Sequence, residues 1–192
     1  DSTAKSHKLG HSLVANGTTA DVAWMVTDSI DCISSFIEPI DGTPVDEKPV
    51  FVRTITLRGF DASDESVDRE RLLNIICTAT GKPMSPNVPG VVFHSGLLST
   101  AREIYAEMKK YILWTSPRHK LVFNGHSIGG ALSILMLLLL VCDKGADYAM
   151  DRVLRVFSHG SPPVSAIVPA LDQKKTSGRK PKPGSGKKKG SD

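Results

Sequence analysis

The sequence is poor in cysteine and has no long hydrophobic run. Its three cysteines, Cys32, Cys77 and Cys142, are widely spaced, so they indicate neither a disulfide framework nor a zinc site and favour a reducing compartment. The longest apolar run, residues 131–142, spans 12 residues with Ser133 inside it. A membrane-spanning helix needs about 20 residues, and this run therefore predicts a buried core helix.

The basic balance of the chain comes from its last residues. The formal net charge is +4, yet residues 174–192 contain eight Lys and Arg against one acid, Asp192. The remainder is mildly acidic, so no nucleic-acid partner is expected for it. The Lys, Gly, Pro and Ser content of residues 169–192 predicts a disordered tail. A solvated tail is the favoured interpretation, and tethering to anionic lipid or nucleic acid is the alternative.

Alternating strand and helix patterns predict an α/β fold with a mostly parallel sheet. Thr100 and Glu103 form a capping box ahead of the apolar positions Tyr105, Met108 and Ile112, which predicts an amphipathic helix that ends before Pro117. The other expected elements are strands at 49–57, 91–93, 120–124 and 153–157, a short helix near 67–76 and an apolar helix at 131–141. Residues 1–20 are polar and small and are expected to be disordered, while 21–40 fit a strand or a short helix equally well.

Residues 125–129 read Gly-His-Ser-Ile-Gly, the G-x-S-x-G pattern of a nucleophile elbow. In such a turn Ser127 stands between a strand and a helix on strained backbone, and the glycines on either side leave room for it. An apolar strand directly before the motif and an apolar helix directly after it favour this interpretation over a chance turn. Ser127 is therefore the candidate nucleophile.

A serine hydrolase also needs two backbone donors for the developing oxyanion. The N–H of Ile128 is the first candidate, because it opens the helix that follows the serine. The second is the N–H of Phe60, which follows Arg58-Gly59 at the end of the strongest upstream strand. An ordinary glycine after a strand explains the Arg58-Gly59 step equally well.

Four segments resemble, in order, motifs of the class 3 (fungal-type) lipases, and most closely those of the plant plastid branch. They are Thr56–Gly59, Val92–Leu97, Phe123–Ala131 and Val156–Pro162. The resemblance covers roughly residues 21–165 and implies a partial α/β-hydrolase fold. Together with the composition of the two ends, the sequence predicts three parts: a disordered segment 1–20, an incomplete hydrolase domain at 21–168 and a disordered tail at 169–192.

Two features depart from the family pattern. Phe60 stands where the family has Ser or Thr, so it offers an N–H but no hydroxyl. In this fold the acid and the histidine of the triad follow the serine, yet Asp172 is the one acid between Ser161 and Asp192, and no histidine follows His159. The triad Asp and His are therefore absent from this chain, which indicates a fragment. The other histidines, His94, His119, His126 and His159, are poor candidates for the base.

The resemblance implies hydrolysis of acylglycerols or polar glycerolipids through an acyl-enzyme, with no cofactor and no metal. The expected partners are a lipid or other acyl-ester substrate and a peripheral membrane surface. The alternative is a non-catalytic lipase-like protein that binds lipid or a partner. The loop at 61–90 is a lid candidate by position, and a plastid or cytoplasmic location is favoured. The chain begins at Asp1 without methionine, which is typical of a fragment or a processed product.

Overall fold

A five-stranded sheet forms the centre of the computed structural model, which describes residues 10–32, 49–59, 68–78, 80–84, 90–113 and 116–168. The strands run in the order β1-β2-β3-β6-β7. Their bounds are β1 Ser12–Thr19, β2 Val22–Cys32, β3 Pro49–Leu57, β6 His119–His126 and β7 Val153–His159. The sheet combines an antiparallel half and a parallel half.

The antiparallel half corrects one expectation from the sequence. Residues 1–20 are predicted to be disordered, whereas Ser12–Thr19 form strand β1 and pair with β2 from Thr19↔Val22 to Ser12↔Asp28. The ambiguous segment 21–40 is a strand as far as Cys32, and residues 33–40 lie outside the described residues. The folded part therefore begins before residue 21.

The parallel half confirms the predicted α/β class. Strand β3 has the predicted bounds and pairs in parallel with β6, which pairs in parallel with β7. The register aligns Leu57 with Gly125 and His126 with His159, so three strands end together at one edge. In parallel sheets, this carboxyl edge is where ligands bind.

The strand expected at residues 91–93 belongs to a second, smaller sheet and not, as the sequence predicts, to the parallel sheet. Strand β5 (Val91–His94) pairs antiparallel with β4 (Gly81–Lys82) and with β8 (Ser165–Ile167), in the order β4-β5-β8. The pattern Val91-Val92-Phe93 correctly predicts a strand. It carries no information about the partner strands, of which β8 lies more than seventy residues away in sequence.

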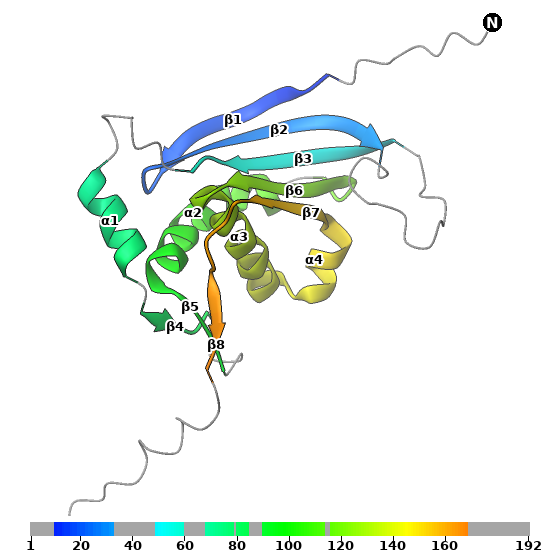
Figure 1. Cartoon of the computed structure of the whole chain (residues 1–192). Coiled ribbons are helices and arrows are strands. Elements are labelled where there is room, and N and C mark those ends of the chain that lie inside the picture. Colours follow the sequence, from blue (N-terminus) through cyan, green and yellow to red (C-terminus); the bar gives the residue numbers. More distant parts are fainter. Residues whose placement is uncertain are drawn as a thin grey trace, which may run out of the picture.

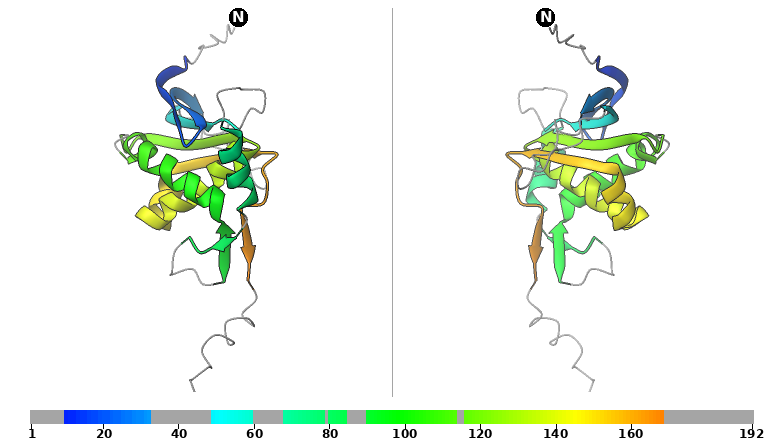
Figure 2. Two further views of the ribbon diagram at one scale, coloured as in Figure 1. Left: turned by 90° about the vertical axis from the view of Figure 1, so that its left-hand side faces the viewer. Right: turned by 90° about the vertical axis from the view of Figure 1, so that its right-hand side faces the viewer.

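The helices cover one face of the central sheet. Helices α2 (Ser95–Leu113), α3 (Ile128–Lys144) and α4 (Ala146–Arg152) lie beneath it, while α1 (Arg69–Cys77) flanks one end (Figures 1 and 2). No helix of the described ranges lies on the opposite face. The predicted helices near 67–76 and at 131–141 correspond to α1 and α3, and α4 was not predicted.

Helix α2 packs as predicted but starts earlier. Tyr105, Met108 and Ile112 are buried in the core, as their spacing predicts. The helix begins at Ser95, so Thr100 lies within it and is buried, and the predicted capping box is wrong. The Ser95 hydroxyl donates to the carbonyl of Thr78 at 2.7 Å, an interaction that ties the start of α2 to the end of α1.

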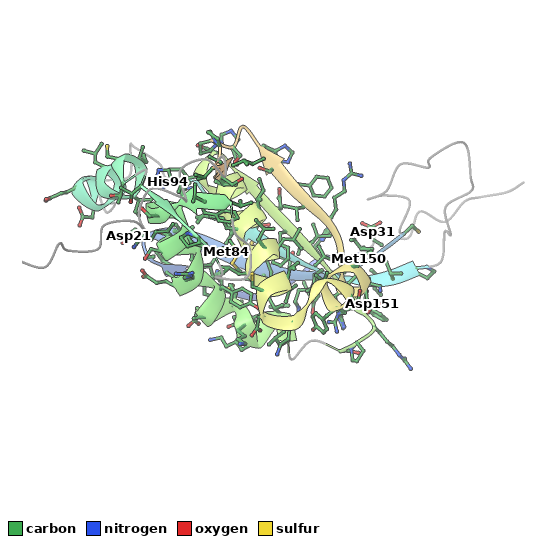
Figure 3. All side chains as sticks on the ribbon, turned by 90° about the horizontal axis from the view of Figure 1, so that it is seen from below. Asp21, Asp31, Met84, His94, Met150 and Asp151 are labelled. Atoms are coloured by element: carbon green, nitrogen blue, oxygen red, sulfur yellow. The ribbon has the colours of Figure 1, made fainter. Side chains whose placement is uncertain are left out.

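The opposite ends of the helical layer carry different elements. Seen from below, His94 of β5 lies toward one end of the molecule, and Met150 and Asp151 of α4 lie toward the other end (Figure 3). Within the part of the chain that the structure describes, none of the three cysteines is in a disulfide. Among the described residues, no helix is both long and apolar enough to cross a membrane.

An ion pair ties the end of α2 to the sheet. Arg53 donates from Nε and Nη2 to the two carboxylate oxygens of Asp28, both at 2.8 Å, and from Nη1 to the carbonyl of Tyr111 at 3.0 Å. The hydrogen bond from Arg53 holds the pKa of Asp28 below its ordinary value. The pair links β2, β3 and the last turn of α2.

Replacing Arg53 with methionine is expected to lower the free energy of unfolding at pH 7 by about 2 kcal/mol, because the charge-assisted bonds to Asp28 are lost. A lowered carboxylate pKa stabilises the folded state at pH values above the unfolded-state pKa of about 3.9. This contribution disappears as the pH falls through the folded-state pKa. In urea unfolding, the difference in free energy of unfolding between the wild type and Arg53→Met should therefore become smaller below about pH 4. A difference in free energy of unfolding that stays constant on acidification would contradict this role of the ion pair.

Candidate functional site

The predicted turn between strand and helix is present at Ser127. Strand β6 ends at His126, helix α3 begins at Ile128, and Ser127 between them has φ 55° and ψ −124°. Positive φ is rare for a residue with a side chain and stores strain of about 1–3 kcal/mol. The Ser127 N–H donates to the carbonyl of His159 at 2.7 Å, and its carbonyl accepts from the N–H of Ala131 at 3.1 Å. These two bonds hold the strained residue in place.

The glycines around Ser127 are required by close backbone contacts. A Cβ on Gly125 would lie 2.2 Å from the carbonyl group of Gly129, and one on Gly129 would lie 2.1 Å from the carbonyl oxygen of Leu57. A Cβ on Gly59 would lie 2.8 Å from the carbonyl oxygen of His126 and 3.4 Å from Cβ of Ser127. The turn therefore packs directly against the end of β3, as the G-x-S-x-G spacing predicts.

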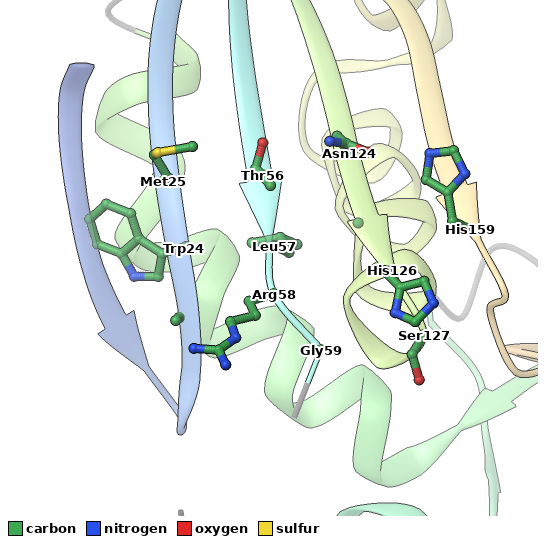
Figure 4. Close-up of a pocket in the computed structure, with 12 residues that line it drawn as sticks. Trp24, Met25, Thr56, Leu57, Arg58, Gly59, Asn124, His126, Ser127 and His159 are labelled. Carbon is green, nitrogen blue, oxygen red and sulfur yellow. The ribbon is translucent and has the colours of Figure 1, made fainter. Parts of the chain in front are cut away.

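A pocket of about 780 Å³ opens beside Ser127. It lies where β2, β3, β6 and β7 converge, on the side of the sheet away from the helices (Figure 4). The lining residues are Ala23, Trp24, Met25, Thr56, Leu57, Arg58, Gly59, Asn124, Gly125, His126, Ser127 and His159. Several of them were not singled out from the sequence, because their convergence depends on strand register.

The two histidines of this pocket do not bond to the serine. Among the described residues, none forms a hydrogen bond with the Ser127 hydroxyl, and this hydroxyl points away from the ring of His126 (Figure 4). His94 instead bonds through Nε2 to the carbonyl of Ile76 at 3.0 Å. His119 is the first residue of β6 and so lies roughly 20 Å from its end.

Of the two predicted oxyanion donors, Ile128 lies within the described residues and Phe60 does not. Ile128 is the first residue of α3, where the N–H has no carbonyl acceptor within the helix. Phe60 lies outside the described residues, as does much of the lid candidate at 61–90. Helix α1 is described within that candidate, and its Ile75 carbonyl lies so close to Gly96 that a Cβ there would approach it to 2.3 Å.

The strain at Ser127 can be measured independently of any chemistry. A glycine at this position adopts positive φ freely, whereas alanine retains the cost of about 1 kcal/mol or more for its Cβ. Ser127→Gly is therefore expected to be more stable than Ser127→Ala by about 1 kcal/mol, measured by urea unfolding at neutral pH. Equal stability of the two variants would mean that the turn relaxes to negative φ when the hydroxyl is removed.

Comparison with known proteins gives both a family and a fold. Residues 60–170 match the family described as lipase (class 3). The phospholipase A1 PLIP2, chloroplastic, of Arabidopsis thaliana is 25% identical over 161 residues, which cover 76% of this chain and 21% of that protein. The chain thus spans about a fifth of this curated relative.

Solved structures of fungal lipases share the fold. The lipase from Rhizopus microsporus var. chinensis superposes with a TM-score of 0.52 at 18% identity, over 81% of this chain and 46% of that chain. An MDLA variant from Penicillium cyclopium gives a TM-score of 0.51 at 17% identity, over 82% and 48%. The chain thus spans just under half of each. It has a partial α/β-hydrolase fold, and it belongs to the class 3 lipase family.

Proposed function

We propose that this chain carries the nucleophile of a lipid-ester hydrolase, with Ser127 attacking the ester carbonyl. The observation that supports this role is the strained turn at Ser127, which places the residue at the carboxyl edge of the sheet and at the start of α3. Attack would form a covalent acyl-enzyme and release the alcohol, and water would then release the fatty acid. The N–H groups of Ile128 and Phe60 would stabilise the oxyanion in both steps.

Ser127 requires a general base, and we propose that the triad Asp and His come from a further part of a longer protein. The support is the extent of the match, since this chain spans about a fifth of the plant relative and just under half of the fungal lipases. The acid and the histidine follow the serine in this fold. The sequence predicts a hydrolase domain at 21–168. The domain proposed here also includes β1, and it extends to the part of the longer protein that contributes the triad Asp and His.

The proposed substrates are acylglycerols or polar glycerolipids, presented at the surface of a membrane or lipid droplet. The name of the plant relative, a phospholipase A1, supports a glycerolipid, and its description as chloroplastic supports a plastid location. The pocket beside Ser127 combines apolar side chains with hydroxyl, amide and imidazole groups, as a lipid with a polar headgroup requires.

A substrate panel tests this function on the longest natural form of the protein. We expect turnover of p-nitrophenyl butyrate and of a short-chain diacylglycerol, with no turnover of p-nitrophenyl phosphate or of a peptide p-nitroanilide. Hydrolysis of the phosphate or the anilide in preference to both esters would contradict the proposal.

A non-catalytic, lipid- or partner-binding protein is the second candidate. It is favoured by the Ser127 hydroxyl, which forms no hydrogen bond with another described residue. Without a base the hydroxyl is a weak nucleophile. Binding of a short-chain glycerolipid by the longest natural form, with no release of fatty acid, would favour this candidate over the hydrolase.

A further inference from the structure

The imidazole ring of His94 connects helices α1 and α2. The N–H of Leu97 in the first turn of α2 donates to Nδ1 of the ring at 3.4 Å, and Nε2 bonds to the carbonyl of Ile76 in the last turn of α1 at 3.0 Å. Helix α1 lies at the end of the sheet toward which β3 points (Figure 1). Ser127 follows β6, which runs parallel to β3, so it lies at the same end of the sheet.

The two bonds together require one particular form of the ring. A carbonyl oxygen can only accept, so Nε2 must carry a proton in order to bond to Ile76. A backbone N–H can only donate, so Nδ1 must be free of a proton in order to accept from Leu97. The neutral ring with its proton on Nε2 meets both conditions. A ring with both nitrogens protonated keeps the bond to Ile76 and loses the bond to Leu97.

The two helix ends act on a charged ring in opposite directions. The first turn of α2 carries a partial positive charge, and the last turn of α1 carries a partial negative charge. A positively charged His94 is therefore repelled by the N–H of Leu97 and attracted by the carbonyl of Ile76. Both effects favour a bond to α1 alone once the ring gains a proton.

The N–H of Leu97 depends on this ring for its hydrogen bond. Leu97 is the third residue of α2, where an N–H has no acceptor within the helix, and the residue is buried. The N–H groups of Ser95 and Gly96, which complete the same turn, bond instead to carbonyls of the segment that follows α1. Protonation of His94 would therefore leave the Leu97 N–H without an acceptor among the described residues.

The surroundings of His94 contain no carboxylate that forms an ion pair with it among the described residues. Its ring lines a hollow of about 250 Å³, whose other lining residues, from β4, β5 and the segment at β8, do not titrate. Lys82 of β4 and Glu103 of α2 line a different hollow. The remaining groups that can carry a charge on the packed elements, among the side chains that the structure describes, are Glu70 and Cys77 of α1 and Arg102, Glu107, Lys109 and Lys110 of α2.

We propose that His94 is a proton-sensitive link between α1 and α2: the neutral ring joins the two helices, and the protonated ring bonds to α1 alone. A free imidazole takes up a proton as the pH falls through about 6.5. Because α1 lies at the end of the sheet that carries Ser127, proton uptake would change how firmly the segment at that end is held. The inference goes beyond the proposed function and does not depend on it, since no step of ester hydrolysis enters it.

Hydrogen exchange of the Leu97 amide in the longest natural form tests the link. The measurement is mass spectrometry with fragmentation to single residues at about pH 7.5 and about pH 5.5, expressed as a protection factor, which corrects for the pH dependence of the intrinsic exchange rate. We expect the protection factor of Leu97 to fall by about threefold to tenfold at the lower pH, as the loss of one hydrogen bond predicts. The amide of Phe123, in the middle of β6, should keep its protection.

Two substitutions of His94 separate its two bonds. Asparagine places an oxygen near the position of Nδ1, does not titrate and is favoured ahead of a helix, so His94→Asn should protect the Leu97 amide equally at both pH values. Glutamine places its amide nitrogen near the position of Nε2, so His94→Gln should leave the Leu97 amide weakly protected at both. His11 is exposed and precedes β1, so His11→Gln is the matched control and should show the change of the wild type.

Three results would overturn the proposal. A protection factor of Leu97 that is the same at both pH values in the wild type would show that protonation does not break the bond. A fall of wild-type size in His94→Asn would assign the pH dependence to another group. An equal fall at Phe123 would mean that the whole domain loosens at the lower pH and that the effect does not belong to this link.

Discussion

Replacing Ser127 with alanine in the longest natural form of the protein is expected to lower kcat/KM for a short-chain ester by roughly 10⁴-fold or more. The hydroxyl would form the covalent acyl-enzyme, and a methyl group cannot replace it. A loss of this size corresponds to about 5 kcal/mol of transition-state stabilisation. The measurement is the initial rate of p-nitrophenyl butyrate hydrolysis over a range of substrate concentrations.

The matched control is a serine outside the pocket. Ser12 lies at the start of β1 and bonds to the carbonyl of Asp28 at 3.4 Å, so Ser12→Ala should keep the wild-type rate. Unfolding curves for both variants would exclude loss of structure as the cause. A Ser127→Ala enzyme that retains more than about a tenth of the wild-type rate would exclude Ser127 as the nucleophile.

Replacing Gly129 with alanine is expected to lower the free energy of unfolding by at least about 3 kcal/mol. The added Cβ would lie 2.1 Å from the carbonyl oxygen of Leu57 and 2.8 Å from its carbonyl carbon, and both atoms belong to the backbone of β3. Helix α3 would therefore have to move away from the sheet. Helix propensity alone predicts the opposite sign, since alanine in place of glycine stabilises an exposed helix by about 1 kcal/mol.

The control for this prediction is a glycine in open space. No atom lies within 4 Å of a Cβ built on Gly10, so Gly10→Ala should change the stability by less than about 0.5 kcal/mol. Urea unfolding at neutral pH measures both variants. A Gly129→Ala protein as stable as the wild type would show that the turn does not pack against β3 as described.

Local sequence patterns predict the centre of the site well. Strand β3 and the turn at Ser127 are specified by short segments: a β-branched run that ends in Arg58-Gly59, and two glycines placed symmetrically around one serine. The contacts of Gly125 and Gly129 explain why this spacing is informative, since each glycine is required by a backbone atom that lies nearby. A pattern that depends on such close contacts allows few alternative structures.

Elements that depend on distant partners were predicted poorly. Strand β1 has few apolar residues, and it is a strand because it pairs with β2. Strand β5 was placed in the wrong sheet, because its partner β8 follows much later in the chain. The capping box at Thr100 was misleading, since α2 starts at Ser95, where side-chain and backbone bonds to Thr78 and Thr80 fix its first turn.

The pocket residues show the same limit. Thr56 and Asn124 lie on two strands that pair in parallel, Arg58 directly follows the first of them, and only the register places all three in the lining of one pocket with Ser127. The oxyanion donor expected at Phe60 lies outside the described residues and stays a prediction. The sequence thus identifies the candidate nucleophile, and the fold supplies its surroundings.

Covalent trapping with a fluorophosphonate is the most direct test of Ser127 as the nucleophile, because this reagent reacts with activated serines. Trypsin would release residues 121–144 as one peptide, which contains both Ser127 and Ser133. We expect a phosphonate adduct that fragmentation assigns to Ser127 in the longest natural form and that is absent from Ser127→Ala. An adduct on Ser133 or on another residue, or equal labelling of the Ser127→Ala variant, would contradict it.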